Sequence, residues 1–346
     1  MSSQSILCCK PPQTRFLIFS LACLCALFAS SATLPAQTWT QTPAPNEAWM
    51  GLACSSDGTK LVASCWTGSS HVSVYTSTNS GATWLSNNVS AELGCSAVAC
   101  SADGTRLAAG LICGGICTSS DGGATWIFHS VPVDSWSSIV CSTDGARLLA
   151  VGTGMVLAST NYGTAWEVVP AWDPWTVPGQ VVACSNDMST LFTAVAGIHP
   201  GPISVSKDFG VTWKSTTAPL TNWSSLACSA DGTKIVAGAY DYNHFPNPGG
   251  VFLSRDSGTT WESVRAPELR WFADKISVTC SSDGNQLLVA DYGFSPGMIC
   301  TSTDFGNSWS SNAAPPGPWS EVAASADGSV RATAVYGEES SPARRL

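Results

Sequence analysis

Acidic and aromatic side chains gather in four short segments of this 346-residue chain, at residues 170–179, 239–250, 266–275 and 290–297. Aromatic rings can cover the apolar face of a sugar, and carboxylates can accept hydrogen bonds from its hydroxyl groups. The combination suits carbohydrate binding. The alternative is that these are solvated loop residues and that the tryptophans pack between neighbouring repeats. The candidate ligand-binding residues are Asp241, Tyr242, His244, Glu268, Arg270, Trp271, Asp274, Asp291, Tyr292, Trp172 and Trp175.

Catalysis would place a further requirement on the residues of the same segments. Hydrolysis of a glycosidic bond requires two carboxyl groups at a set separation. No motif selects a pair, so catalytic residues remain unknown at this level. The acids available for the task are Asp173, Asp241, Glu268, Asp274 and Asp291.

Metal and cofactor chemistry finds little support in the sequence. His71, His199 and His244 lie in separate segments, and none has a second ligand at the short spacing of a zinc site. The chain also contains no nucleotide-binding loop. We therefore expect no metal and no cofactor.

A repeated sequence motif, called here the first phrase, predicts the elements that position these segments. Residues 254–261 read SRDSGTTW, and close copies occur at 77–84, 119–126, 159–166, 206–213 and 302–309. The phrase predicts a tight turn, because an Asp or Asn side chain can accept backbone N–H groups within it and the large Trp ring can pin it. A calcium loop is excluded, because each copy holds at most one carboxylate. The structural residues predicted for these turns are Asn79, Asp121, Asn161, Asp208, Asp256, Asp304, Trp84, Trp126, Trp166, Trp213, Trp261 and Trp309.

A second phrase alternates with the first. It reads WSSLACSADGTKIVA at 223–237, and its seven copies carry Cys or, in the last copy, Ala324 at one marker position, spaced 41 to 52 residues apart. Asp-Gly between two apolar runs indicates a hairpin. Each unit of about 44 residues therefore fits four short strands, as in one blade of a β-propeller.

These turns resemble the Asp-box, or BNR, repeat of sialidases, sortilin-type receptors, xyloglucan-cleaving glycosidases and photosystem II assembly factors. The resemblance implies a β-propeller with the boxes at its periphery, but it does not imply one function. The Arg-Ile-Pro motif of sialidases is absent. The repeated cations Lys60, Arg106, Arg147 and Lys234 follow the Asp-Gly hairpins, on the face opposite the variable segments. The assembly factors are similar in size, yet this chain is acidic and lacks a basic patch.

The predicted fold is all-β, a seven-bladed β-propeller of four-stranded blades whose ring is closed by the N-terminal strand. Trp39 resembles the Trp of a missing seventh box, so we expect it in the last blade, beside the strand that contains Ala332–Tyr336. After that strand only a short polar tail remains. The last blade is therefore expected to be incomplete, or the chain to be truncated.

The first 36 residues have the pattern of a secretory signal peptide. Lys10 and Arg15 precede an apolar run at 16–32, which small residues follow. A membrane helix is the alternative, but the run is short for one. We expect residues 1–36 to be removed, residues 37–346 to form a single propeller domain, and the protein to be secreted, periplasmic or at the cell surface without stable membrane insertion.

The net charge bears on the class of partner, and the cysteine positions bear on the redox state of the thiols. The net charge is −9, which disfavours binding to nucleic acid through its phosphates. Of 15 cysteines, six occupy the marker position that Ala324 fills in the last repeat. An alanine in the same place indicates a small buried apolar site, so we expect these thiols to be reduced.

The sequence thus predicts a secreted, non-enzymatic propeller that acts as a binding or scaffold module for a protein or carbohydrate partner. The alternative is a glycoside hydrolase, sialidase-like or otherwise exo-acting, that uses carboxylates on the variable face.

Overall fold

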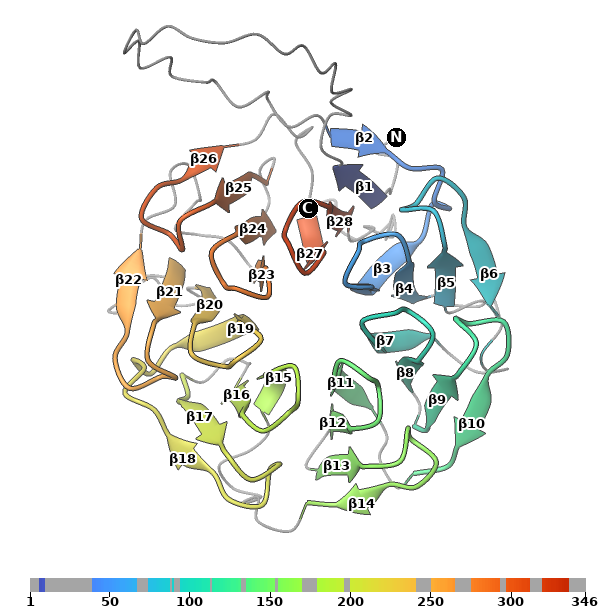
Figure 1. Cartoon of the computed structure of the whole chain (residues 1–346), viewed down its shortest axis with the longest axis horizontal. Helices are drawn as coiled ribbons and strands as arrows, with labels where there is room; N and C mark the ends of the chain where they lie inside the picture. Colours follow the sequence, from blue (N-terminus) through green and yellow to red (C-terminus); the bar gives the residue numbers. More distant parts are fainter. Residues whose placement is uncertain are drawn as a thin grey trace, which may run out of the picture.

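Every regular element that the structure describes is a β-strand (Figure 1). The computed structural model describes residues 6–9, 39–66, 74–87, 89, 94–112, 114–131, 135–152, 155–169, 179–195, 200–240, 250–264, 275–292, 297–311 and 319–335. No helix in these ranges is long and apolar enough to span a bilayer.

Six sheets each consist of four consecutive antiparallel strands. They follow one another around a common axis, and the first strand of each sheet is the innermost (Figure 1). The six sheets comprise β3 Ala48–Cys54, β4 Leu61–Trp66, β5 Val74–Ser77 and β6 Leu85–Asn87; β7 Cys95–Cys100, β8 Leu107–Leu111, β9 Ile116–Ser119 and β10 Ile127–His129; β11 Trp136–Cys141, β12 Leu148–Gly152, β13 Met155–Ser159 and β14 Glu167–Val168; β15 Gly179–Cys184, β16 Leu191–Val195, β17 Ile203–Ser206 and β18 Lys214–Ser215; β19 Asn222–Cys228, β20 Ile235–Tyr240, β21 Gly250–Ser254 and β22 Glu262–Val264; and β23 Lys275–Cys280, β24 Leu287–Tyr292, β25 Ile299–Ser302 and β26 Ser310–Ser311.

A further sheet is assembled from both ends of the chain, in the order β2-β1-β28-β27. Its inner strands are β27 Trp319–Ala324 and β28 Arg331–Val335, and its outer strands are β1 Ile6–Cys9 and β2 Trp39–Gln41. In Figure 1 this composite sheet lies between the first and the sixth of the consecutive sheets.

The composite sheet corrects the predicted fold in three respects. Six blades, not seven, are built from a continuous stretch of chain. The last sheet is not incomplete, and two N-terminal strands rather than one take part in it. Trp39 does not lie beside β28, because it pairs with Cys9 of β1, which is inserted between β2 and β28. The sequence pattern assigned residues 6–9 to the leader, and therefore this strand was not expected.

The hairpins between first and second strands are joined by a circle of backbone hydrogen bonds. The N–H of one residue in each hairpin donates to the carbonyl of its counterpart in the next sheet, at 2.7 to 2.8 Å, and the last bond returns to the first hairpin. The residues in the circle are Ser56, Ala102, Thr143, Asn186, Ala230, Ser282 and Ala326. These bonds fix the innermost ends of all the sheets around the axis.

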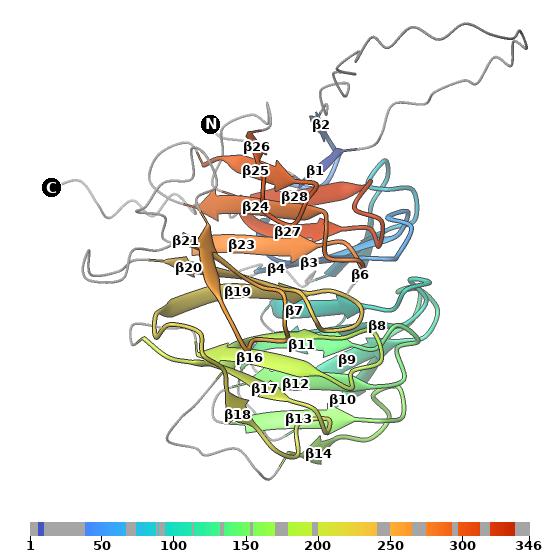
Figure 2. The ribbon, with the colours of Figure 1, turned by 60° about the vertical axis from the view of Figure 1, so that its left-hand side comes forward.

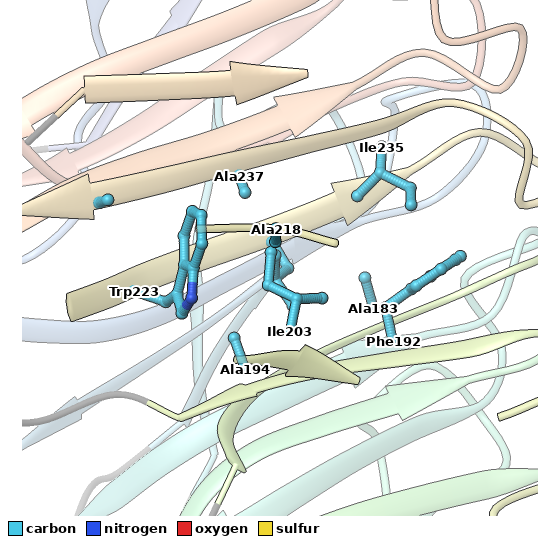
Figure 3. Packing of buried hydrophobic residues seen from close by; sticks show 10 residues of the cluster. Ala183, Phe192, Ala194, Ile203, Ala218, Trp223, Ile235 and Ala237 are labelled. Atoms are coloured by element: carbon cyan, nitrogen blue, oxygen red, sulfur yellow. The ribbon is translucent and has the colours of Figure 1, made fainter. Parts of the chain in front are cut away.

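The sheets are held together by large side chains that enter the space between neighbouring blades. Trp223 of β19 is fully buried in a cluster with Ile203 and Ala218 (Figure 3). Its ring meets that of Phe252 edge-on at 5.2 Å. The second strands supply small partners such as Ala237. This alternation of large and small residues lets the faces interdigitate at the density of a protein interior.

The turns between third and fourth strands have the side-chain hydrogen bonds that their sequence predicts. In the fifth consecutive sheet, Asp256 accepts a hydrogen bond from the N–H of Thr260 at 2.8 Å and another from the hydroxyl of Ser254. Gly258 has φ +85°, and a Cβ there would lie 2.8 Å from Thr216, so only glycine suits the position. The Trp261 indole N–H donates to the Gly258 carbonyl.

Candidate functional site

A cavity of about 400 Å³ lies on the axis, at the end where the innermost strands begin. Its wall is formed mainly by Gly, Ala, Val and Ser residues of these strands. Each innermost strand is paired on one side only, so it presents an edge of backbone N–H and C=O groups toward the axis. Figure 2 shows the strands running side by side. The hairpins follow the ends of the innermost strands, so the cavity lies at the opposite end of the axis from the hairpins.

Two charged residues interrupt this neutral wall. Lys275 begins β23, five residues before its marker cysteine, where four other repeats have a tryptophan. Glu321 of β27 occupies a position that the other repeats fill with Gly, Ala, Val or Ser. The two side chains form an ion pair across adjacent sheets, with exposed fractions of 36% and 23%. The pair therefore gives the cavity a cation and an anion that face solvent.

The strand that carries Lys275 also differs in its backbone. In the other six innermost strands the register with the second strand shifts near the start, as it does between Trp223 and Ser225. In β23 the register is continuous, and Lys275 pairs directly with Tyr292. A β-bulge changes the direction of the following side chains. Because the bulge is absent, Ile276 takes the paired position that Trp223 holds in β19. Lys275 lies one residue nearer the start of the strand, at the cavity.

Serine residues at the bulges connect neighbouring sheets. The hydroxyl of Ser224 donates to the carbonyl of Ile276 at 2.6 Å and accepts the N–H of the same residue at 3.1 Å. Ser96 donates to the Trp136 carbonyl in the same manner. These hydrogen bonds join the first strands of neighbouring sheets beside the cavity, so the strands that form its wall are linked to one another.

Two of the predicted ligand-binding residues lie in the part of the chain that the structure describes. Asp291 is 2% exposed, and it accepts a hydrogen bond from the N–H of Met298 at 2.5 Å. The Asp291 carboxylate therefore links the end of β24 to the residue that precedes β25. Tyr292 is half-buried opposite Lys275.

The other predicted ligand-binding residues lie outside the described ranges. They are Asp241, Tyr242, His244, Glu268, Arg270, Trp271, Asp274, Trp172 and Trp175. Tyr240 immediately precedes the segment 241–249, and Lys275 immediately follows the segment 265–274. Both Tyr240 and Lys275 line the axial cavity. The attachment points of two predicted segments are thereby placed at the cavity.

Sequence reasoning missed the Lys275–Glu321 pair, although a signal for it was present. When the seven copies of the second phrase are aligned on the marker position, Lys275 and Glu321 are charged where their equivalents are neutral. Such departures from a repeat are informative, because the shared positions already account for the fold.

A ring of thiols occupies the opposite, hairpin end of the axis, around a smaller cavity of about 180 Å³. The Cys54 thiol donates to the Ala324 carbonyl at 3.0 Å, and the Cys184 thiol contacts the Cys141 carbonyl at 3.6 Å. Burial raises the pKa of Cys184 to about 12. Cys100, Cys141, Cys184, Cys228 and Cys280 are free thiols. No group of three metal-ligating side chains in the described ranges is arranged to hold a metal ion.

The cations that follow the hairpins serve contacts between blades on the same face. Arg106 lies over the ring of Tyr162 in the next turn, at 4.2 Å. Lys234 donates to the carbonyl of Asp283 at 2.9 Å and lies near the ring of Phe305. These cations are thus engaged far from the cavity that holds Lys275.

The aspartates of the hairpin face are also held by local hydrogen bonds. The N–H of Thr105 and the hydroxyl of Ser101 donate to Asp103 and lower its pKa to about 2. The hydroxyl and N–H of Thr125 do the same for Asp121. The hydrogen bonds within the turns account for the positions and lowered pKa values of these carboxylates without a ligand.

No protein-family model matches the chain, and no curated protein matches its sequence. Solved structures share its fold. The GH74 xyloglucanase from Xanthomonas campestris has a TM-score of 0.68 at 13% identity, over 84% of this chain and 51% of that one. Hydrazine synthase from Kuenenia stuttgartiensis has a TM-score of 0.66 at 17% identity, over 84% and 93%. YCF48 bound to D1 peptide has a TM-score of 0.60 at 12% identity, over 86% and 96%.

These similarities show a β-propeller related in shape to both glycoside hydrolases and a photosystem II assembly factor. The chain spans about half the length of the xyloglucanase that it matches. At these identities the likeness concerns the fold, and the activity of the neighbours does not extend to this chain.

Proposed function

We propose that the protein is a non-enzymatic binding module that holds an extended polypeptide segment of a partner over the mouth of the axial cavity. The observation that carries this proposal is the Lys275–Glu321 ion pair, which places charge where the other repeats have neutral residues in the described part of the cavity wall. A peptide offers amide groups to the strand edges and charged side chains to the pair.

The charges described in the cavity wall suit the binding of a charged ligand. Within the described ranges, Glu321 is the one carboxylate that lines the cavity, and its partner is Lys275. Glycoside hydrolysis requires a second carboxyl group at a set separation. Asp291, the one candidate acid within the described ranges, is buried and accepts a hydrogen bond from the Met298 N–H.

The partner class is supported by a structural neighbour and by the shape of the wall. YCF48, which has a similar fold, is described as bound to D1 peptide. We extend peptide binding to this chain as part of the proposal, and an exported location as well, because residues 10–32 have the leader pattern. The box-type turns then serve as the structural periphery.

The proposal is tested by exchanging the charges of the pair. The labelled full chain is first screened against a phage-displayed peptide library and a glycan array. The double variant Lys275→Glu/Glu321→Lys keeps an ion pair but reverses its direction. We expect peptides to be selected, and we expect their affinity to fall at least about tenfold in this variant, because each charge of the ligand now meets a like charge.

A matched control exists on the outer rim. Arg255 and Glu262 form an exposed ion pair at 3.3 Å, with exposed fractions of 45% and 54%. The variant Arg255→Glu/Glu262→Arg should leave peptide affinity unchanged. Selection of glycans alone, release of sugar from them, or equal losses in the two double variants would reject the proposal.

A further inference from the structure

The third position of the composite sheet is filled by a strand that comes from the N-terminus. Ile6 of β1 pairs with Ala334 of β28, and Cys9 pairs with Arg331. On its other side β1 pairs with β2, with Leu7 opposite Gln41. The strand is thus hydrogen-bonded along both edges, like the third strand of every other blade.

Ile6 anchors this strand in the core. Its side chain is 0% exposed and belongs to a cluster with Trp49, Tyr75 and Ala334. Its carbonyl accepts hydrogen bonds from both the N–H and the hydroxyl of Thr42, each at 2.9 Å. The position therefore selects an extended backbone with one large aliphatic side chain.

The covalent attachment of β1 is unlike that of the other third strands. Those strands are joined to their second strands in sequence, whereas β1 has no direct connection to β28, which lies at the far end of the chain. Its one link to the fold is the stretch from Lys10 to Thr38, which contains the apolar run at 16–32. A cut in this stretch separates β1 from the rest of the protein.

Loss of β1 would leave a gap between β28 and β2. The backbone groups along one edge of β28 would lose their partners, and the cluster around Trp49 would lose Ile6. Unpaired strand edges next to exposed apolar surface are templates for strand addition. The gap has the length, direction and apolar pocket of a strand-binding site.

We infer that the third position of the composite sheet is an exchangeable strand site. β1 fills it in the uncut chain. Once the leader is removed, it takes an extended strand of a partner polypeptide, antiparallel to β28, with an isoleucine-like residue in the place of Ile6. This site does not include the axial cavity, and it does not depend on the function proposed for that cavity.

The test retains every residue of the chain. A site-specific protease sequence is inserted after Gln13, and the purified protein is cut there, so that β1 remains present as a separate fragment. A fluorescent synthetic peptide of residues 3–11 is then added under reducing conditions. We expect it to displace the fragment and to bind one equivalent of the cut protein, whereas the uncut chain, with its tethered β1, binds at least about 100-fold less.

Variant peptides test whether the pocket recognises the side chain at position 6. The Ile6→Asp peptide should bind at least about 100-fold more weakly, because its carboxylate would be buried without a partner. The Ile6→Val peptide should bind within about tenfold of the original. The Lys275→Glu/Glu321→Lys protein should bind the original peptide normally, which separates this site from the axial cavity.

Three results would overturn the inference. The cut protein could fail to bind the peptide while it remains folded. It could unfold when cut, which would show that β1 is not exchangeable. The Ile6→Asp peptide could bind as well as the original, which would show that the pocket at Ile6 is not recognised.

Discussion

Two tryptophans at the same repeat position provide a test of how the spaces between blades are stabilised. Trp223 and Trp136 are 0% and 1% exposed. The Trp223 indole N–H donates to the carbonyl of Gly201 at 2.8 Å, whereas the Trp136 N–H has no partner among the described residues. Replacement by Phe removes a similar volume at both positions. The two substitutions differ chiefly in one hydrogen bond.

The size of the difference follows from what each substitution leaves behind. Trp223→Phe leaves the Gly201 carbonyl without this donor, in a buried residue, at a cost of about 1–3 kcal/mol. Trp136→Phe removes an N–H that is buried and unpaired, so part of the lost packing is offset. We expect Trp223→Phe to lower the free energy of unfolding by about 1–3 kcal/mol more than Trp136→Phe, and the melting temperature by about 2–6 °C more.

Urea unfolding of the full chain, followed by tryptophan fluorescence and by circular dichroism, measures both variants. The denaturant dependence should be the same in each, because the surface exposed on unfolding hardly changes. Equal losses of stability, or a larger loss for Trp136→Phe, would refute the view that the Gly201 contact distinguishes these positions.

Further predictions concern acid, thiols and the division between scaffold and site. The pKa of Asp103 is lowered to about 2 in the folded state, so its contribution to stability is present above its unfolded pKa near 4 and is lost as the pH falls from about 4 to about 2. Asp103→Asn should make the urea midpoint fall less between pH 5 and pH 2 than it does in the unchanged protein, and an identical fall would contradict this; part of the fall should remain, because other aspartates such as Asp121 also have a lowered pKa. Burial raises the pKa of Cys184 to about 12, so iodoacetamide at pH 8 should label it after denaturation and not before; recovery of a Cys184 disulfide peptide would contradict this. Trp261→Ala should lower the melting temperature and preserve the affinity of the folded fraction, whereas Trp271→Ala should weaken ligand binding with little loss of stability. Equal destabilisation by both would assign Trp271 to packing.

The turns could be predicted from the sequence because their chemistry is local. Asp256 binds the N–H of a residue four positions later, and Gly258 takes its positive φ within the same turn. Nothing distant in the chain is required for these interactions. The same holds for the hairpins, where Ser229 and Asp231 interact over two residues.

The composite sheet could not be predicted in the same way. β1 is four residues long, and its partner β28 lies more than 300 residues away in the chain. A short apolar run before a basic residue also fits the start of a leader. Local pattern therefore gave one interpretation of residues 6–9, and pairing with a distant edge gave another.

The candidate site shows that the composition of a segment does not predict which of its side chains are accessible. The sequence predicts Asp291 as a ligand-binding residue because acids and aromatics surround it, yet its carboxylate is buried and accepts the Met298 N–H. Composition does not give the direction of a side chain. The direction depends on register, and in β24 the register places Asp291 opposite Ile276.

The Lys275–Glu321 pair combines evidence from the sequence with evidence from the structure. Neutral residues at the two positions, as in the other repeats, would avoid the desolvation of two charges. Partly exposed ion pairs contribute little to stability, and exposed fractions of 36% and 23% place this pair in that range. The packing of the fold therefore gives no reason for charge at these positions. A ligand in the axial cavity would supply one, since the pair lies in its wall together with Tyr240. Tyr240 and Lys275 each adjoin a variable segment.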